Sequence, residues 1–321
     1  MSKNSNNQGR AFEYACITSL HQKTIEVNEN SEIEYNSAYE AAERAWNSIP
    51  IDAQDQMKLA AECAANVIFD LEPCIIDKEL GKITFRLQKD QSGTHGDVRD
   101  IVLSQEKSDW EIGLSIKNNH YAVKHSRLSR GLDFGKNWYG ISCSSEYWEQ
   151  VNPVFSNLST LKEKKIKWSD VLDKDNSVYK PILNGFLIEV LKAYNEDSSM
   201  VKRLVEYLVG MFDYYKVVSV SSDEETIIQT YNIHGSLNKS STKAKPKILI
   251  PKVNLPTRII HFGFKPNSNT TLELYMDEGW QLSFRIHNAS TTVEPSLKFD
   301  VQFVGAPTSV SVIRCQWRKR K

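Results

Sequence analysis

Acidic and basic side chains lie at the ends of two predicted strands, in a pattern suited to phosphodiester hydrolysis. The segment 96–117, GDVRDIVLSQEKSDWEIGLSIK, predicts two short β-strands, DIVL and WEIGLSIK, joined by a polar turn. Asp97 and Asp100 stand at the start of the first strand, and Lys117 ends the second. A carboxylate in this position can hold a divalent metal, and a lysine can help place a water and balance charge on a phosphate. We therefore expect a catalytic site at these strand ends.

The sequence before this segment predicts helices followed by a strand. The polar pair 36–37 is a typical N-cap, and a strand over 82–87 followed by a turn at 91–96 leads into the acidic strand. Helices are expected over 10–21, 38–49 and 53–69.

The sequence after this segment predicts mixed structure and then mostly strands. WYGISC, at 138–143, predicts another buried strand, and helices are expected over 146–158, 181–195 and 200–215. From Lys216 onward, short β-branched and aromatic runs alternate with Gly, Pro, Asn and Ser. The fold class is therefore α/β (α+β), with a core region over 1–215 that includes the N-terminal helices and a β-rich region over 216–321.

Bulk composition indicates an ordinary globular protein. The chain has 321 residues, 25% of them charged, and a formal net charge of zero, which argues against a histone-like binder but not against a local DNA-binding cleft. Five scattered cysteines without metal-site spacing are expected to be reduced and mostly buried. Without a signal peptide or an apolar run long enough to span a membrane, a cytoplasmic location is expected.

Two segments have the composition of a DNA-contacting surface. The stretch 118–135 is polar and basic, and Arg285, His287 and Asn288 follow one another on or just after a predicted strand. Arginine suits guanine and asparagine suits adenine in the major groove, and cations suit phosphates. A solvated loop and a surface strand with polar residues outward are the alternatives. The candidates for DNA contact are Asn118, Asn119, His120, Lys124, His125, Arg127, Arg285, His287 and Asn288.

Six blocks of this sequence resemble the HaeIII-type family of type II restriction endonucleases, within the PD-(D/E)xK nuclease group. The blocks follow the same order along nearly the whole chain, and the long middle and C-terminal blocks are the specific ones. They are NQGRAFEYACITSL (7–20), GDVRDIVL (96–103), WEIGLSIKNNHYAVKHSRLS (110–129), LDFGKNWYGISCS (132–144), GFKPNS (263–268) and SFRIHNASTTVEPSLKFD (283–300).

The resemblance implies a restriction-endonuclease-like core and Mg²⁺-dependent cleavage of double-stranded DNA, with Mn²⁺ able to substitute. It further implies recognition of GGCC, blunt cutting between G and C, and a partner cytosine methyltransferase that protects host DNA. The β-rich region 216–321 is then expected to recognise DNA. A palindromic site is most simply read by a homodimer, although sequential cuts by a monomer are the alternative.

The resemblance also suggests site residues. Asp100 matches the strand carboxylate, with Asp97 as its rival, and Lys117 matches the lysine of the motif. Ser115 stands where many of these nucleases have an acid, and a hydroxyl is a poor ligand for Mg²⁺. Glu111 shares a strand face with Ser115 and Lys117, but it lies four residues before Ser115, about 13 Å away along an extended strand. Glu13, on the first predicted helix, is therefore expected as the second metal ligand, the alternative being a first-turn acid favoured by the helix dipole.

Two other functions fit the same residues. The chain could be a nuclease of this fold with a different task, which the cutting pattern on unmodified DNA would reveal. It could also be a DNA-binding protein with a decayed active site, a reading that Ser115 favours. The retention of Asp97, Asp100 and Lys117 argues against decay.

Overall fold

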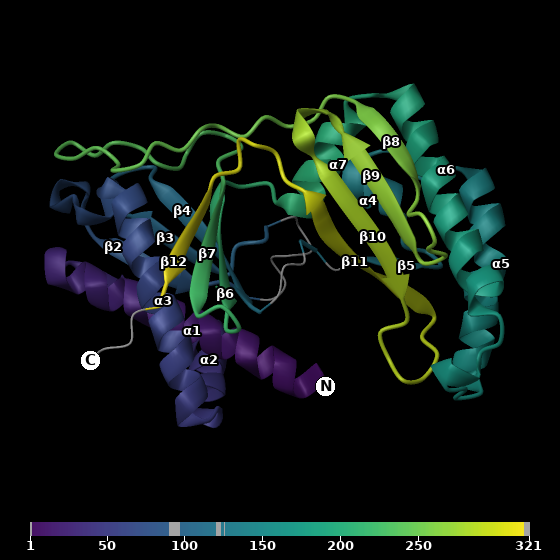
Figure 1. Ribbon diagram of the computed structural model, residues 1–321, viewed down its shortest axis with the longest axis horizontal. Coiled ribbons are helices and arrows are strands. Elements are labelled where there is room, and N and C mark those ends of the chain that lie inside the picture. Colours follow the sequence, from purple (N-terminus) through teal and green to yellow (C-terminus); the bar gives the residue numbers. More distant parts are fainter. Residues whose placement is uncertain (1, 90–96, 120–122, 125, 318–321) are drawn as a thin grey trace. The chain divides into compact units, whose positions relative to one another are not determined.

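The computed structural model describes residues 2–89, 97–119, 123–124 and 126–317 (Figure 1). The chain forms two compact units, each assembled from separate stretches of sequence. Unit 1 comprises residues 1–121, 210–254 and 309–321, and unit 2 comprises residues 122–209 and 255–308. The mixture of helices and sheets confirms the α/β class. The predicted turn at 91–96 lies outside the described residues.

Unit 1 is built on a seven-stranded mixed sheet whose order is β1-β2-β3-β4-β6-β7-β12. The pairs β1–β2 and β4–β6 are parallel, and the other neighbours are antiparallel. The strands are β1 (Ser31–Ile33), β2 (Ile83–Leu87), β3 (Ile101–Gln105), β4 (Glu111–Asn118), β6 (Tyr214–Val220), β7 (Glu225–Tyr231) and β12 (Val312–Gln316).

Three helices cover one face of this sheet. The Asn36 side chain accepts hydrogen bonds from the backbone N–H groups of Ala38 and Tyr39, so the predicted cap is confirmed. Alanines along the third helix, including Ala60 and Ala64, are fully buried, and their small size permits close packing. The elements are α1 (Ser2–Val27), α2 (Ser37–Ser48) and α3 (Ile51–Leu71), followed by 3₁₀ turns η1 (Pro73–Ile76) and η2 (Lys78–Leu80).

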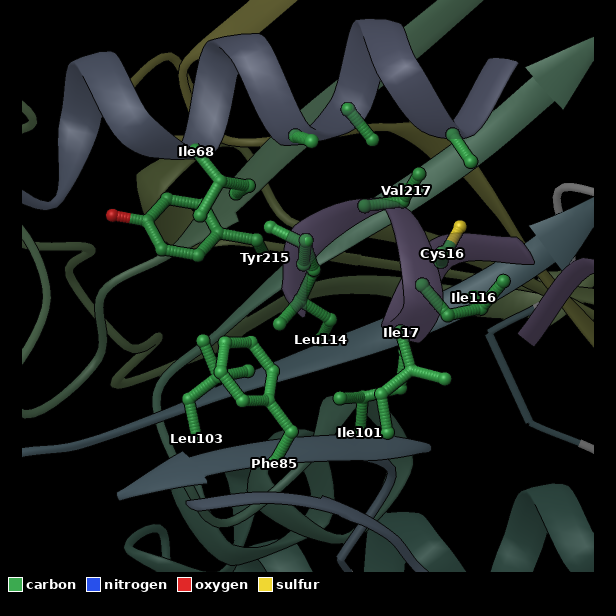
Figure 2. Packing of buried hydrophobic residues seen from close by; sticks show 14 of the residues in the cluster. Cys16, Ile17, Ile68, Phe85, Ile101, Leu103, Leu114, Ile116, Tyr215 and Val217 are labelled. Carbon is green, nitrogen blue, oxygen red and sulfur yellow. The ribbon is translucent and has the colours of Figure 1, made fainter. Parts of the chain in front are cut away.

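The main hydrophobic core of unit 1 lies between these helices and the sheet, as Figure 2 shows. Side chains alternate along β4, so Leu114 and Ile116 point into this core and Ser115 and Lys117 point to the opposite face. Tyr215 and Val217 of β6 join the same core. The other face of the sheet is therefore the one that carries polar side chains from β4 and β6.

Unit 2 packs helices on an antiparallel five-stranded sheet whose order is β5-β11-β10-β9-β8. An aromatic cluster around Phe186 joins helix to sheet, with ring centroids 5.0 Å from Phe299 and 5.6 Å from Phe284. The strands are β5 (Arg127–Ser129), β8 (Ile259–Phe264), β9 (Thr271–Met276), β10 (Gln281–His287) and β11 (Ser296–Gly305). The helices are α4 (Phe134–Tyr139), α5 (Ser145–Glu163), α6 (Lys180–Glu196) and α7 (Met200–Val209), with short turns η4 (Trp168–Asp170), η5 (Asp175–Tyr179) and η6 (Asp277–Gly279).

Several predicted boundaries were wrong. The first helix begins at Ser2 and not near residue 10, and α7 ends at Val209, before Gly210 at φ 135°. The strand predicted over 138–143 is absent, because Trp138 and Tyr139 belong to α4 and Gly140 ends that helix in the left-handed conformation. A short apolar run does not distinguish a buried helix from a buried strand.

The predicted division at residue 215 was also wrong. Strand β6 runs across this boundary and pairs in parallel with β4, with Ser115 opposite Lys216. Strands β6, β7 and β12 therefore belong to the same sheet as the predicted catalytic strands, and residues 216–321 do not form a unit of their own.

Candidate active site

Asp100 and Lys117 lie together at one end of sheet strands β3 and β4. The Lys117 ammonium is 3.1 Å from Asp100 Oδ2, and the two side chains are 28% and 26% exposed. The same oxygen accepts hydrogen bonds from the Ile116 backbone N–H at 2.6 Å and the Ser115 hydroxyl at 3.3 Å. These donors fix the carboxylate, and they all contact Oδ2. The site is therefore rigid on one side and partly open to solvent.

Ser115 holds the carboxylate in this arrangement. It is buried, and its hydroxyl donates to Asp100. A second carboxylate at this position would face Asp100 at short range, and like charges in such proximity raise a carboxyl pKa. Ser115 therefore places a hydrogen-bond donor where many of these nucleases have a negative charge, and this donor orients the Asp100 carboxylate.

Lys216 was not predicted from the sequence, yet it lies beside this group. It pairs with Ser115 on one side and with Gln229 on the other, so its side chain shares their face of the sheet. It is 4% exposed, and burial, with a smaller contribution from the Lys117 charge, lowers its pKa to about 7. A lysine within the otherwise apolar strand YYKVVSV is the sequence signal that could have identified it.

Asp97 has different partners from Asp100. Its carboxylate accepts hydrogen bonds from Arg99 at 2.9 Å and from Gln88 at 2.8 Å, and these bonds hold its pKa below the ordinary value despite burial. Arg99 also pairs with Glu111 at 2.6 Å. A metal at Asp97 would have to displace this guanidinium, so the contacts favour Asp100 over Asp97 as the metal ligand.

The Arg99 side chain lies over strand β4. It passes over Gly113, where an added Cβ would come within 2.0 Å of the Arg99 Cδ atom. The guanidinium carbon lies 4.1 Å from the centre of the Phe212 ring, a cation–π contact. Only glycine at position 113 leaves room for this arrangement. Arg99 and Gly113 were not among the predicted site residues.

Glu13 lies on α1, the helix that covers the core face of the sheet. Cys16, one turn further along, is fully buried and packs near Ile116 (Figure 2). Burial raises the pKa of the Cys16 thiol well above its usual value, and the charges of Glu13 and Asp100 raise it further. Both carboxylates therefore lie within electrostatic range of one buried thiol.

The donors near Asp100 fit a magnesium ion better than a softer metal. Mg²⁺ keeps several waters and is commonly bound through one or two carboxylates plus substrate phosphates. Within the described parts of the chain, no group of three or more His, Cys, Asp or Glu side chains could hold a metal ion. Glu13, Asp97 and Asp100 thus do not form a closed cage, and the Asp100 side chain is partly exposed.

Two of the predicted DNA contacts, Asn118 and Asn119, form hydrogen bonds at the end of strand β4. The Asn118 side chain accepts from the Ser219 hydroxyl at 2.8 Å, and Asn119 both donates to and accepts from Ser221. These bonds tie the end of β4 to β6 and the turn after it. His120 and His125 lie outside the described residues.

The predicted DNA contacts in unit 2 differ in availability. The Lys124 ammonium donates to the Tyr207 carbonyl at 2.8 Å and lies over the Tyr207 ring, and burial lowers its pKa to about 8. Asn288 is used within its own turn, bonding to Ser290, Thr292 and Glu294. These two side chains have structural roles.

Arg127, Arg285 and His287 remain on the surface of the unit 2 sheet. Arg127 is exposed and donates to the Ser296 hydroxyl, whereas Arg285 pairs with Asp300 at 3.2 Å while staying 60% exposed. These three side chains are therefore the accessible members of the predicted set.

Other surface features lie away from the Asp100 group. Hollows of about 570 Å³ beside α3 and β12 and about 580 Å³ beside α6 and residues 264–269 are not lined by Asp100 or Lys117. The predicted duplex substrate would contact an open surface, so the carboxylate–lysine pair is a better candidate for the site than these hollows are. In the part of the chain that the structure describes, no helix has the length and apolar character needed to cross a membrane.

Comparison with known proteins gives two results of wide coverage. The model of the HaeIII restriction endonuclease family matches residues 9–307. The type II restriction enzyme HaeIII of Haemophilus aegyptius is 45% identical over 320 residues, which cover 99% of this chain and 100% of that relative. No solved structure matches this chain.

Proposed function

We propose a set of catalytic roles from one premise, that this chain belongs to the HaeIII restriction endonuclease family and is a type II site-specific deoxyribonuclease. In this proposal Asp100 holds Mg²⁺, Lys117 places and deprotonates the attacking water, and Glu13 supplies a second carboxylate. The observation that carries the proposal is the 3.1 Å contact between Asp100 and Lys117 on a partly open surface.

The side chains around Asp100 prepare it for this role. Ser115 and the Ile116 N–H hold Oδ2, so the carboxylate keeps one orientation when DNA arrives. When bound, Mg²⁺ would lower the pKa of a water and offset charge that develops on the phosphate. Lys117 can release Asp100 and turn toward the scissile phosphate after its ammonium gives a proton to solvent. The neutral amine then accepts a proton from the attacking water, and the ammonium formed in this way balances charge on the phosphate. The products carry 5′-phosphate and 3′-hydroxyl ends.

The finer specificity is also part of the proposal. We assign GGCC as the recognition sequence, with a blunt cut between G and C, from the extent of the family likeness. The palindrome favours a homodimer with one active site for each strand. A cytosine methyltransferase acting on the same sequence would protect host DNA, and the enzyme would act in the cytoplasm with Mg²⁺, or Mn²⁺ in its place.

The deciding experiment is digestion of unmethylated phage DNA in Mg²⁺ by wild type and Lys117→Ala, with sequencing of the fragment ends. We expect blunt GG/CC ends from wild type and a loss of about 10²–10⁴-fold in cleavage rate for the variant, the usual effect of removing an acid–base group. Lys107→Ala is the matched control, because this exposed lysine lies in the turn of the same hairpin.

Each failure of this experiment has a distinct meaning. Other end sequences from wild type would discard GGCC but keep the nuclease. Intact DNA that still shifts in a gel would identify a binding protein with a decayed site. Equal activity of Lys117→Ala and Lys107→Ala would refute the role of Lys117.

A further inference from the structure

Basic side chains form a row across the outer face of the sheet in unit 2. Lys298 of β11 pairs with Arg127 of β5 on one side and with His287 of β10 on the other. Residues paired in this way have Cβ atoms about 5 Å apart and lie on the same face. Arg285, two residues before His287, belongs to the same face. The strands thus bring together side chains that are up to 171 positions apart, from Arg127 to Lys298.

The alternation of burial shows that this face points away from the core. Leu128, Leu297 and Ile286, the sequence neighbours of the row, are fully or almost fully buried. Arg127 is exposed, and Lys298 is partly exposed. The row therefore lies on the solvent side of the sheet, and the apolar side chains pack on the opposite side.

The row carries more positive charge than its surroundings neutralise. Among the described residues, neither Arg127 nor Lys298 forms an ion pair, and the nearby acid Asp300 is paired with Arg285. Burial of the stem, followed by the Arg127 charge, lowers the pKa of Lys298, and Asp300 opposes this effect. Burial, followed by the charges of Arg285 and Lys298, lowers the pKa of His287.

Like charges directly opposite one another destabilise a sheet. The row therefore lowers the stability of the unliganded protein, and an anion bound between its members would remove the repulsion. The substrate class of this family is a polyanion, which supplies such an anion. We propose that Arg127, Lys298 and His287 form a site for one backbone phosphate of the DNA duplex. This proposal rests on the proposed function, which supplies the DNA.

The assignment is to a phosphate and not to a base. Arg127 and Lys298 lie directly opposite one another on neighbouring strands, a spacing that suits a single tetrahedral anion better than the edges of successive bases. Phosphate contacts fix register without reading sequence. Lys298 is the residue that defines the site, because it is the cross-strand neighbour of both Arg127 and His287.

The test is the affinity of full-length Lys298→Gln for two duplexes of equal length, one with GGCC and one with the site scrambled. Affinity is measured by fluorescence anisotropy without divalent metal, at several salt concentrations. We expect binding of both duplexes to weaken about tenfold. The slope of log affinity against log salt should become shallower by about 0.9, the value for one phosphate. Lys298→Arg should restore most of the affinity, and Lys164→Gln, at an exposed position of unit 2, should behave as wild type.

Folding and function are separated by two further readouts. Lys298→Gln should have a thermal midpoint equal to or above that of wild type, because one repulsive charge is removed. An unchanged affinity and slope would overturn the phosphate site, and so would a loss confined to the GGCC duplex, which would indicate base reading. Digestion by wild type is scored separately, so failure of the catalytic proposal is distinguishable from failure of this one.

Discussion

Lys216 of the unit 1 sheet and the arginines of the unit 2 sheet differ in their exposure to solvent. In unit 1, Lys216 is 4% exposed and Glu72 is fully buried, and burial brings the pKa of each to about 7. In unit 2, Arg285 is 60% exposed, Arg127 is exposed and Lys298 is partly exposed. A covered sheet can tune protonation near neutral pH, whereas an open sheet can present fixed charge to a partner. Chemistry and DNA contact thus suit different sheets of one chain.

Buried polar groups in unit 1 also have dense hydrogen bonding. Glu72 accepts from the Tyr215 hydroxyl at 2.5 Å, the Asn238 N–H at 2.6 Å and the Trp110 indole at 3.4 Å. These donors lower its pKa, but desolvation outweighs them. Removing such a group leaves its partners unsatisfied, so substitutions in unit 1 should have larger effects than substitutions on the face of unit 2.

The largest expected effect separates the two aspartates. Asp100→Asn should reduce cleavage about 10³-fold, because a metal ligand supplies several kcal/mol to the transition state. Asp97→Asn should retain most of the chemistry and instead lower stability, because Arg99 loses a charged partner. Cleavage rates at saturating DNA and urea unfolding of both variants would check this. Equal losses of rate would show that the two carboxylates act together.

Lys216→Met should change how stability depends on pH. The pKa of Lys216 falls from 10.5 in the unfolded chain to about 7 in the folded one, so the unfolded state binds more protons between these values. Wild-type stability should therefore rise as pH increases from about 7 to 10, and Lys216→Met should flatten this rise. Urea unfolding at several pH values is the measurement. A slope equal to that of wild type would contradict the buried, tuned state of Lys216.

Glu72→Gln should also change how stability depends on pH, but at lower pH and in the opposite direction from Lys216→Met. The pKa of Glu72 rises from 4.5 to about 7, so the folded state binds more protons in this window and stability should fall as pH increases through it. Glutamine should remove this decline, at a constant cost of about 1–3 kcal/mol for the disturbed bond to Trp110. Thermal midpoints between pH 4 and 8 would check this. A decline that persists in the variant would assign the effect to another group.

The smallest effect is expected on the open face of unit 2. Arg127→Gln removes an exposed charge whose recorded contact is with Ser296, so the unfolding free energy should change by no more than about 0.5 kcal/mol. Urea unfolding is again the measurement. A loss of unfolding free energy as large as that of Asp97→Asn would contradict the expectation that substitutions in unit 1 have larger effects than those on the face of unit 2.

Local sequence patterns predicted the hairpin that carries Asp100 and Lys117 well. Strands β3 and β4 and the proximity of Asp100 to Lys117 follow from alternation and a short turn, which are encoded within about 20 residues. The role of Lys216 was not predictable in this way, because its strand joins β4 by a parallel pairing almost 100 residues later in the chain. Pairings of this kind depend on the whole topology and not on a local window.

The candidates for DNA contact also show that local sequence does not predict the partners of a side chain. Asn118, Asn119, Lys124 and Asn288 have suitable chemistry for DNA, but strand ends, an aromatic ring and a turn use their polar atoms. Residue type alone does not reveal such local partners. Lys298, our proposed phosphate contact, was not among the sequence predictions, because its basic neighbours come from other strands.

The interrupted course of unit 1 has a consequence for biosynthesis. Strand β4 ends at Asn118 and its parallel neighbour β6 begins at Tyr214, so about 95 residues must be translated between them. At about 5–20 residues per second, this delay is about 5–20 s, and the edge strand β12 follows only near the C-terminus. A nascent chain that carries Asp100 and Lys117 therefore lacks the rest of its sheet. The nuclease should gain cutting competence only after β6 has been made, several seconds after its Asp100–Lys117 hairpin, which gives the host an interval free of cleavage by each new molecule.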